Sequence, residues 1–415
     1  MTFPAALTVT FRPGISASFG NVLTLGDTLN GVLGSNVLGT NAAVPVNITA
    51  EVRRVAIRRG RDRQFDTYTS GTCTVELIDT NGDWNPDNTS SPYFGEIKPG
   101  RQLRISAAYN SIAAFLFSGY ITRYQWRWEP ELDANIVTIN ANDGFRILEA
   151  GQITTVAGAA DGDTAGERVD LILGEAGWPS SLRDISAGGI TLQADPGEER
   201  TPLAACQQVE LSDVGSFLIR GDGVAQFRTR ADNALQATQT ATVFTDDPNP
   251  VGPVVRYKSI DVALDDSEIV NQVSAERIDG TPQVFTDSGS ATEFFTRARS
   301  FTDLLHQTDT QSLNLAKQVV NYRSQPALEI RSVSVEMISN DTPRITAGLT
   351  LKIGDSIVVE RSAVGGTVSS ALTVQGVRHN IRLGSWDTTF STAEPLGFAF
   401  VLGSSQYGVL GVSTL

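Results

Sequence analysis

Residues 51–88 read EVRRVAIRRGRDRQFDTYTSGTCTVELIDTNGDWNPDN. The first part places Val55 and Ile57 on one face of an extended chain, because side chains alternate along a strand. Residues 72–78 are rich in β-branched side chains and run into a cluster of turn-forming residues at 79–88. The stretch therefore predicts two strands followed by an ordered turn.

Similar strand patterns occur before and after a long middle region. Further strands are predicted at 101–107, 114–128 and 135–141, which makes 49–148 a β region. A second β region begins at about 254, with strands predicted at 270–277, 327–337, 349–353, 356–360 and 371–382. The chain is therefore expected to contain two β regions.

The middle region, 151–250, combines helices and a hairpin. A helix is predicted after the capping-box pair Thr164 and Glu167, and a second helix begins at Thr201. A hairpin follows at 215–230. One more helix, capped by Thr310, interrupts the second β region, and its spacing suggests a face formed by Leu313, Ala316, Lys317 and Val320.

These elements predict a mainly β protein with a small α+β insertion. The expected parts are an N-terminal strand and Gly/Asn-rich, low-charge arm at 1–50, a first β domain at 51–150, an α+β insertion at 151–250, a second β domain at 251–395 and an apolar arm at 396–415.

Both ends of the chain repeat the triplet Val-Leu-Gly. The segment 13–50 contains a single charged residue, Asp27, and a surface so poor in charge is typical of one that is covered in an assembly. Ordinary turn-rich loops of biased composition are the alternative. The possible assembly-arm residues are Val32, Leu33, Val37, Leu38, Val401, Leu402, Val409 and Leu410.

The overall composition is that of a globular protein with an acidic balance. Of 415 residues, 40% are apolar and 19% are charged. The net charge of −14 opposes tight binding of nucleic acid, because phosphates require clustered cations. No charge-free apolar stretch reads as a membrane span, so no stable membrane insertion is expected. Cys73 and Cys206 lack metal-ligand spacing, and two buried free thiols are predicted.

No set of residues predicts catalysis. His306 and His379 belong to no zinc motif and no nucleophile elbow, and both are interpreted as structural. Acidic pairs such as Asp161 and Asp163 are neighbours in sequence, whereas a glycosidase needs two carboxylates separated across a cleft. We therefore expect no enzyme activity, no catalytic residue and no cofactor.

Two other motifs have alternative interpretations. Residues 79–87 alternate oxygen-bearing side chains as a calcium loop does, but Trp84 stands where such a loop has glycine, so a side-chain-capped turn is favoured and no metal is expected. The arginine cluster at 53–63 is open to phosphate contact, to intersubunit ion pairs, or to pairing with neighbours such as Glu51 and Asp62. The acidic balance of the chain favours the last.

A longer motif is more specific than any of these. Residues 59–66 precede the strand 69–77, the loop 79–88, a Ser-Pro-Tyr triplet at 91–93, a Lys-Pro-Gly-Arg turn at 98–101 and a Leu-Phe-Ser-Gly-Tyr-Ile strand at 116–121. This order resembles the minor tail proteins, or baseplate (tail tip) hub proteins, of siphophages. Softer matches at 351–355 and 377–389 extend the resemblance over nearly the whole chain. The residues of the family-signature loop are Asp79, Gly82, Asp83, Pro86, Ser91, Pro92, Tyr93, Pro99 and Gly100.

The resemblance implies a structural protein of the virion, located at the tip of a long tail and made in the host bacterial cytoplasm. Such hubs are homotrimers, in which two tube-like β-barrel domains per subunit assemble as a ring. The implied partners are a distal tail or tail tube protein above, the tape-measure protein, a central fibre or spike below, and DNA only in transit through the lumen. A trimer would carry three times −14, or −42, and an acidic lining is expected to let DNA slide.

Two other function classes compete with the hub. A receptor-binding or carbohydrate-binding tail tip protein should expose Trp or Tyr side chains, whereas the five tryptophans mostly fall where core packing is expected. A tail-associated lysin would need catalytic residues that the sequence lacks. The leading hypothesis is therefore a non-enzymatic hub that closes the tail tube and adapts its sixfold symmetry to a threefold tip.

Overall fold

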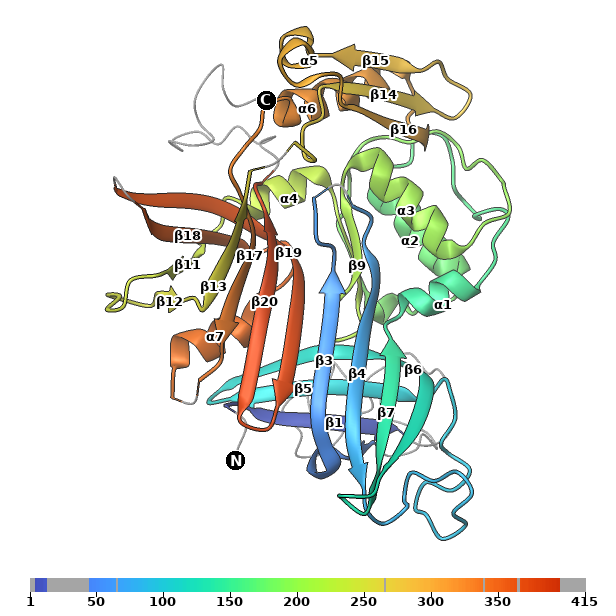
Figure 1. The fold of residues 1–415 in the computed structure, drawn as a ribbon. Coiled ribbons are helices and arrows are strands. Elements are labelled where there is room, and N and C mark those ends of the chain that lie inside the picture. Colours follow the sequence, from blue (N-terminus) through green and yellow to red (C-terminus); the bar gives the residue numbers. More distant parts are fainter. Residues whose placement is uncertain are drawn as a thin grey trace.

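The computed structural model describes residues 4–12, 45–64, 66–264, 266–338, 340–363 and 366–395 (Figure 1). All of the possible assembly-arm residues lie outside these described residues. Strands dominate the fold, as the sequence predicts. The strands are β1 (Ala6–Arg12), β2 (Val46–Asn47), β3 (Val52–Gly60), β4 (Thr69–Asp79), β5 (Gln102–Tyr109), β6 (Ile112–Glu129), β7 (Ala134–Asn142), β8 (Arg183–Ile185), β9 (Ser216–Ile219), β10 (Ala225–Arg228), β11 (Thr242–Thr245), β12 (Val255–Arg256), β13 (Ser259–Ala263), β14 (Gln272–Arg277), β15 (Gln283–Thr286), β16 (Ala298–Leu304), β17 (Glu329–Glu336), β18 (Ser356–Ala363), β19 (Gly366–Arg382) and β20 (Ser385–Ala393).

The helices are short, with lengths from six to fifteen residues. They are α1 (Phe145–Ala150), α2 (Ala165–Glu175), α3 (Pro202–Asp213), α4 (Arg230–Gln236), α5 (Ser288–Phe294), α6 (Asp309–Arg323) and α7 (Thr342–Thr350), with single 3-10 turns at Thr49–Glu51 and Ser180–Leu182. None of the described helices combines the length and the apolar character that a membrane crossing requires.

Most strands belong to one large sheet. Its order is β12-β11-β18-β19-β3-β4-β7-β6-β5-β1-β2, and β20, β17 and β13 continue it from β19 in a second direction. Eight of these strands form an uninterrupted antiparallel path, β6-β7-β4-β3-β19-β20-β17-β13. The first four strands of this eight-stranded path come from the first β region, and the last four come from the second.

The two β regions meet where β3 pairs with β19. Gly60 and Gly376 face each other at one end of this pair, and Gly60 has a φ of +90°. A Cβ atom at Gly60 would lie 2.4 Å from the carbonyl oxygen of Gln375, so only glycine allows the strands to approach this closely. The described residues contain no closed barrel, and the two expected barrels are therefore not confirmed. The two regions instead share one sheet.

One face of the eight-stranded path forms a core. Val55, Val75 and Ile139 are fully buried in the first half, and Trp386 and Phe390 are fully buried in the second. They alternate with exposed or half-buried residues, as expected for a sheet that has one face in the core and one in solvent. The alternation predicted from Val55 and Ile57 is confirmed.

The insertion begins as the sequence predicts. Helix α2 carries the predicted capping box, in which Thr164 accepts a hydrogen bond from the Glu167 backbone and Glu167 accepts one from the Thr164 backbone. Helix α3 begins after Thr201, with proline in its first turn. The predicted hairpin consists of β9 and β10, and β8 joins them in a three-stranded sheet. Val169, Ile172 and Leu173 bury the apolar face of α2.

The helix in the second β region differs from the prediction. Helix α6 is capped by Thr308, whose side chain accepts from the Gln311 backbone, and not by Thr310. Ala316 and Val320 are buried as predicted, because the cap sets where a helix begins and leaves the angle between its residues unchanged. Leu315, Val319 and their neighbours pack against the three-stranded sheet β15-β14-β16, while Lys317 is exposed.

The strand predicted at 349–353 is also wrong. Residues up to Thr350 belong to α7, which is capped by Asp341 and carries Pro343 in its first turn. Proline at that position favours a helix start, and this signal outweighs the short apolar run that follows. Ile345 and Leu349 of α7 pack into the core beneath the first half of the eight-stranded path.

Candidate functional site

The face of the eight-stranded path opposite the core is polar across its whole width. In a sheet, residues that face each other on neighbouring strands point to the same side. One row of such residues runs Asn142, Thr72, Arg58, Arg378, Thr389, Ser334 and Ser259, and a second runs Arg123, Asn140, Thr74, Ala56, Asn380, Asp387 and Glu336. We call this surface the polar face.

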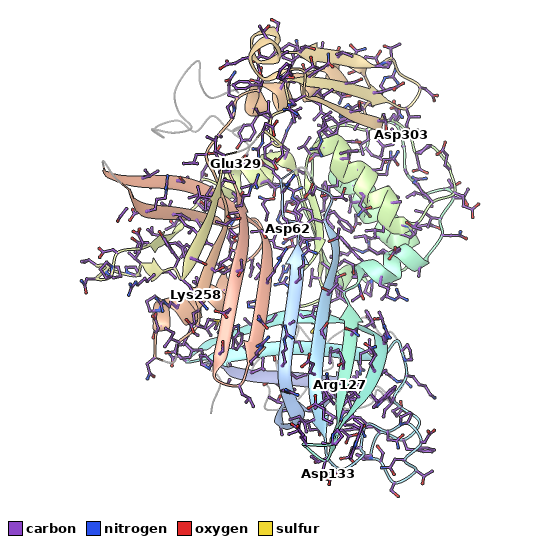
Figure 2. All side chains as sticks on the ribbon, in the orientation of Figure 1. Asp62, Arg127, Asp133, Lys258, Asp303 and Glu329 are labelled. Carbon is purple, nitrogen blue, oxygen red and sulfur yellow. The ribbon has the colours of Figure 1, made fainter. Side chains whose placement is uncertain are left out.

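The charges of the polar face are nearly balanced. Asp62 lies 2.7 Å from both Arg58 and Arg378, and Lys258 lies 2.8 Å from Asp387 (Figure 2). These side chains are a third to a half exposed, so each pair contributes at most about 1 kcal/mol to stability. The polar face therefore does not share the acidic balance of the whole chain, on which the expected acidic lining depended.

The arginine cluster is mostly part of this surface. The pairing predicted between its arginines and Asp62 is present, whereas no arginine in the described part of the chain forms an ion pair with Glu51. Glu51 instead accepts a hydrogen bond of 2.5 Å from the indole of Trp84, and burial raises the pKa of its carboxyl group. Arg59 and Arg61 differ from these: Arg59 lines a cleft on the other side of β3, and Arg61 bonds to Gln375 and lies over the ring of Tyr68.

Both ends of the eight-stranded path are open. Strand β5 pairs with β6 only as far as Tyr120, and β7 pairs with β6 from Tyr120 to Glu129. Beyond Ile121 no other described strand pairs with β6, and β13 pairs with β17 alone. Two rows of backbone groups are therefore free to pair with another chain.

The open half of β6 exposes aromatic side chains. Trp126 is 42% exposed and Trp128 is 54% exposed, and Trp126 stacks beside Tyr124 with ring centroids 6.1 Å apart. The expectation that core packing explains the tryptophans holds for Trp84, Trp178 and Trp386, which are buried, and is wrong for these two. The sequence places Trp126 and Trp128 on one face, but only the topology reveals that nothing described covers them.

The family-signature loop joins β4 to β5 and is organised around Asp79. Its carboxylate accepts hydrogen bonds from the backbones of Asp83 and Trp84 at 2.9 and 3.2 Å. Trp84 is fully buried against Phe11 and Tyr93. In the described residues there is no cluster of three or more groups that could hold a metal, and the side-chain-capped turn is the observed arrangement. Of the signature residues, Asp79, Ser91 and Tyr93 are buried, Gly82 and Asp83 are half-buried, and Pro86, Pro92, Pro99 and Gly100 are exposed.

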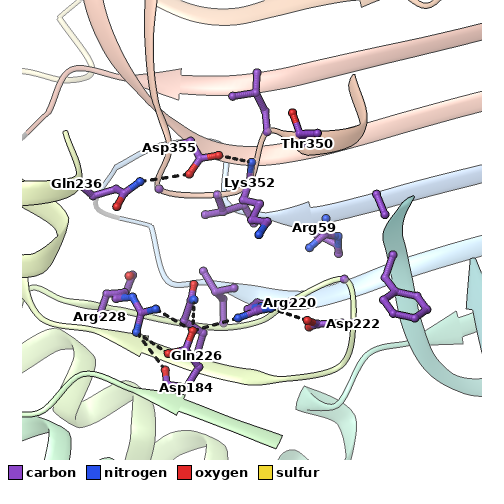
Figure 3. A pocket seen from close by; sticks show the side chains of 18 of the residues that line it. Arg59, Asp184, Arg220, Asp222, Gln226, Arg228, Gln236, Thr350, Lys352 and Asp355 are labelled. Atoms are coloured by element: carbon purple, nitrogen blue, oxygen red, sulfur yellow. Dashed lines mark hydrogen bonds and ion pairs between the residues drawn. The ribbon is translucent and has the colours of Figure 1, made fainter. Parts of the chain in front are cut away.

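A cleft of about 710 Å³ lies between the insertion and the large sheet (Figure 3). On one wall, Asp184 accepts hydrogen bonds from Arg220 at 3.0 Å, Gln226 at 2.8 Å and Arg228 at 2.7 Å. Burial opposes the charge of Asp184, but the bonds from Arg228 and Gln226 outweigh it and lower its pKa. An acid held ionised in this way is a poor proton donor. No sequence pattern predicts this cleft, because the residues that form its walls are far apart in the chain.

The histidines and cysteines have structural environments. His306 Nε2 donates to the carbonyl of Ser212 at 2.9 Å, and burial lowers its pKa. His379 is buried beside Thr388, and burial lowers its pKa to about 3. Cys73 and Cys206 are free and buried, as predicted, and burial raises the pKa of both thiols.

Comparison with other proteins identifies the fold. Models of protein families give no match to the chain, and neither do the sequences of curated proteins. Among solved structures, the 43 kDa tail protein of prophage MuSo2 from Shewanella oneidensis is similar over 94% of this chain and 98% of its own, at 11% identity and a TM-score of 0.55. A tail protein from Neisseria meningitidis is similar over 94% of this chain and 97% of its own, at 12% identity and a TM-score of 0.56. Over nearly its whole length, the chain therefore has the fold of phage tail proteins.

Proposed function

We propose that the protein is a structural hub at the tip of a long-tailed phage tail, and that it assembles as a homotrimeric ring. The observation that carries the proposal is the eight-stranded antiparallel path with two open edges and one polar face. The tail proteins of the same fold support it.

An even number of antiparallel strands allows copies to join edge to edge. Because β6 and β13 run in opposite directions, β6 of one copy next to β13 of another continues the antiparallel alternation. Such a contact is heterologous, and a rotation that closes makes a ring. Each copy supplies two four-stranded units, one from 51–150 and one from 251–395, so three copies supply six units. A ring of three copies thereby offers pseudo-sixfold symmetry to a tube and threefold symmetry to a tip.

In this arrangement the polar face lines the bore and the buried face points outward into the subunit. The ring closes the tail tube, contacts a distal tail or tail tube protein above and the tape-measure protein, and holds a central fibre or spike below. DNA passes through the bore next to the polar face. The positive and negative charges of this face are paired, so they form no continuous cationic surface that would bind the phosphates. The hub works by shape and pairing, with no catalytic step.

The mass and shape of the purified chain test the proposal. Native mass spectrometry should give three times the chain mass of 44.4 kDa, and electron micrographs should show a ring with a central bore. A stable monomer at virion-like concentrations would contradict the hub. Clearing of a suspension of purified bacterial cell walls by the chain would contradict the absence of catalysis.

The exposed aromatic residues of β6 favour one alternative, a carbohydrate-binding tail tip protein. Indole rings stack on sugar rings, and Trp126 and Trp128 are accessible in the single chain. Titration with host surface saccharides separates the two functions, because binding would change tryptophan fluorescence in the assembled particle. In the hub, these side chains are already covered by the next copy.

A further inference from the structure

Arg59 lies at the floor of the cleft without a protein partner. Its Nε–H group is buried and donates to no acceptor, and no described residue forms a hydrogen bond or an ion pair with its guanidinium. Figure 3 shows it between the wall that carries Lys352 and the wall that carries Arg220 and Asp222. Burial lowers the pKa of Arg59, while the charges of Asp143 and Asp222 raise it through space.

The other arginines of the cleft are satisfied. Arg220 pairs with Asp184 at 3.0 Å and with Asp222 at 2.5 Å, and Arg228 pairs with Asp184 at 2.7 Å. A buried polar group without a partner costs stability, and native structures contain few of them. Arg59 is therefore a buried hydrogen-bond donor of the cleft that no described residue satisfies.

We propose that the cleft binds a carboxylate, which Arg59 holds through paired hydrogen bonds. The planar guanidinium presents parallel N–H groups that match the two oxygens of such a group. A phosphate carries more negative charge and would lie among four aspartates of the cleft, which repel it. These aspartates are Asp184, Asp222, Asp232 and Asp355.

The ligand carries apolar groups next to its carboxylate. Phe115, Leu218 and Leu349 line the same cleft as Arg59, and the cleft volume of about 710 Å³ far exceeds that of a carboxylate alone. Lys352 supplies a second cation, and no described acidic group lies within ion-pair distance of its ammonium. Two sources have this chemistry: a small organic acid with an apolar body, and a glutamate flanked by apolar residues in a segment of another tail protein.

Four probes identify the source on the full chain. The probes are acetate, inorganic phosphate, acetyl-Leu-Glu-Leu-amide and the same peptide with Gln in place of Glu. Binding of each probe is measured by the change in the NMR signal of the Arg59 Nε–H group, in protein labelled with 15N at arginine. The Glu peptide should shift this signal and the Gln peptide should not. If acetate binds as tightly as the Glu peptide, the natural ligand is a small organic acid. If acetate binds more weakly than the Glu peptide, the natural ligand is a segment of another protein. Phosphate binding tighter than both, or no shift with any probe, overturns the proposal.

Two substitutions separate binding from folding. Arg59→Gln should weaken binding of the Glu peptide by about tenfold or more, whereas Arg146→Gln, on the exposed side of α1, should leave it unchanged. Arg59→Met should have a thermal midpoint equal to or above that of the unliganded parent, because it removes an unpaired buried charge. A clear fall in the midpoint would mean that the folded chain already satisfies Arg59, and would contradict a vacant site.

Discussion

At the scale of single residues, a few buried side chains hold long irregular segments in place. Trp84 is the clearest case, because it fills the space between the signature loop and the first β region. Its ring lies 5.2 Å from that of Phe11 and 4.9 Å from that of Tyr93, and its N–H bonds to Glu51.

Replacing this anchor should loosen the loop. Trp84→Ala is expected to lower the free energy of unfolding by roughly 3–5 kcal/mol, because it removes a fully buried ring and leaves the Glu51 carboxyl group without its donor. The urea midpoint measures the change. Trp128→Ala is the matched control, since that side chain is 54% exposed and should cost less than about 0.5 kcal/mol in the monomer. Equal losses in the two variants would contradict the assigned role.

Glu210 should make the stability of the chain depend on pH. Burial raises the pKa of its carboxyl group from 4.5 to about 8 in the folded chain. Its proton is bound more tightly in the folded state, so the stabilisation is complete below about pH 4.5 and is lost as the pH rises towards 8. The Gln side chain stays neutral at every pH. The free energy of unfolding of Glu210→Gln, relative to that of the parent, should therefore rise by roughly 2–4 kcal/mol between about pH 4.5 and pH 8.

Thermal or urea unfolding at several pH values checks this expectation. The exposed Glu198→Gln variant is the control and should follow the parent throughout. A constant difference between Glu210→Gln and the parent from pH 5 to 8 would contradict it.

At the scale of elements, the sequence predicts a helix correctly where a capping residue and the apolar spacing that follows it indicate the same start. The caps at Thr164 and Thr201 are predicted correctly, because the capping residues and the apolar spacing that follows give the same answer. At α6 two threonines compete, and the decisive partner is Gln311, three residues after Thr308. The pairing of β3 with β19 has no local signal, since the strands are more than 300 residues apart.

Edge pairing should be sensitive to proline at β13. The Met337 N–H donates to the Trp386 carbonyl on the β20 side of β17, so alternation along β17 turns Ser332 and Ser334 toward Asp261 and Ser259 of β13. The N–H group of Ile260 therefore points toward the open edge. Ile260→Pro should keep the single chain folded but lower the assembly constant by about tenfold or more. Light scattering measures the assembly.

Val251→Pro provides the comparison for this variant. That residue is 94% exposed in a loop next to another proline, and its substitution adds the same ring without touching the edge. If both variants assemble as the parent does, β13 is not the joining strand.

At the scale of the whole molecule, the polar face follows from sequence alternation, but its extent does not. Each strand reveals which residues share a face, so the rows through Arg58 and Asn140 could be drawn in part from the sequence. These rows form one surface only because the eight strands pair in a particular order, and the alternation within single strands does not reveal that order. The cleft at Arg59 is invisible for the same reason, because its walls come from β3, the insertion and the segment after α7.

Assembly should protect two tryptophans. In the single chain, Trp126 and Trp128 are open to solvent while the other three are buried, so iodide should quench part of the fluorescence. In the ring this accessible fraction should fall, because β6 lies at the joint. A variant with Trp126→Phe and Trp128→Phe should lose the difference between the two states. An unchanged accessible fraction on assembly would place the joint elsewhere.

The distance along the chain between β3 and β19 has a consequence for biosynthesis. Arg54 and Asn380 are 326 positions apart, so at bacterial or eukaryotic elongation rates the bare side of β3 waits roughly 15–65 s for its partner to leave the ribosome. During that interval the nascent first half presents a strand edge that any neighbouring chain can occupy. Formation of the β3–β19 pair is therefore the step at which aggregation competes with productive folding. Slower translation lengthens the time during which β3 is unpaired.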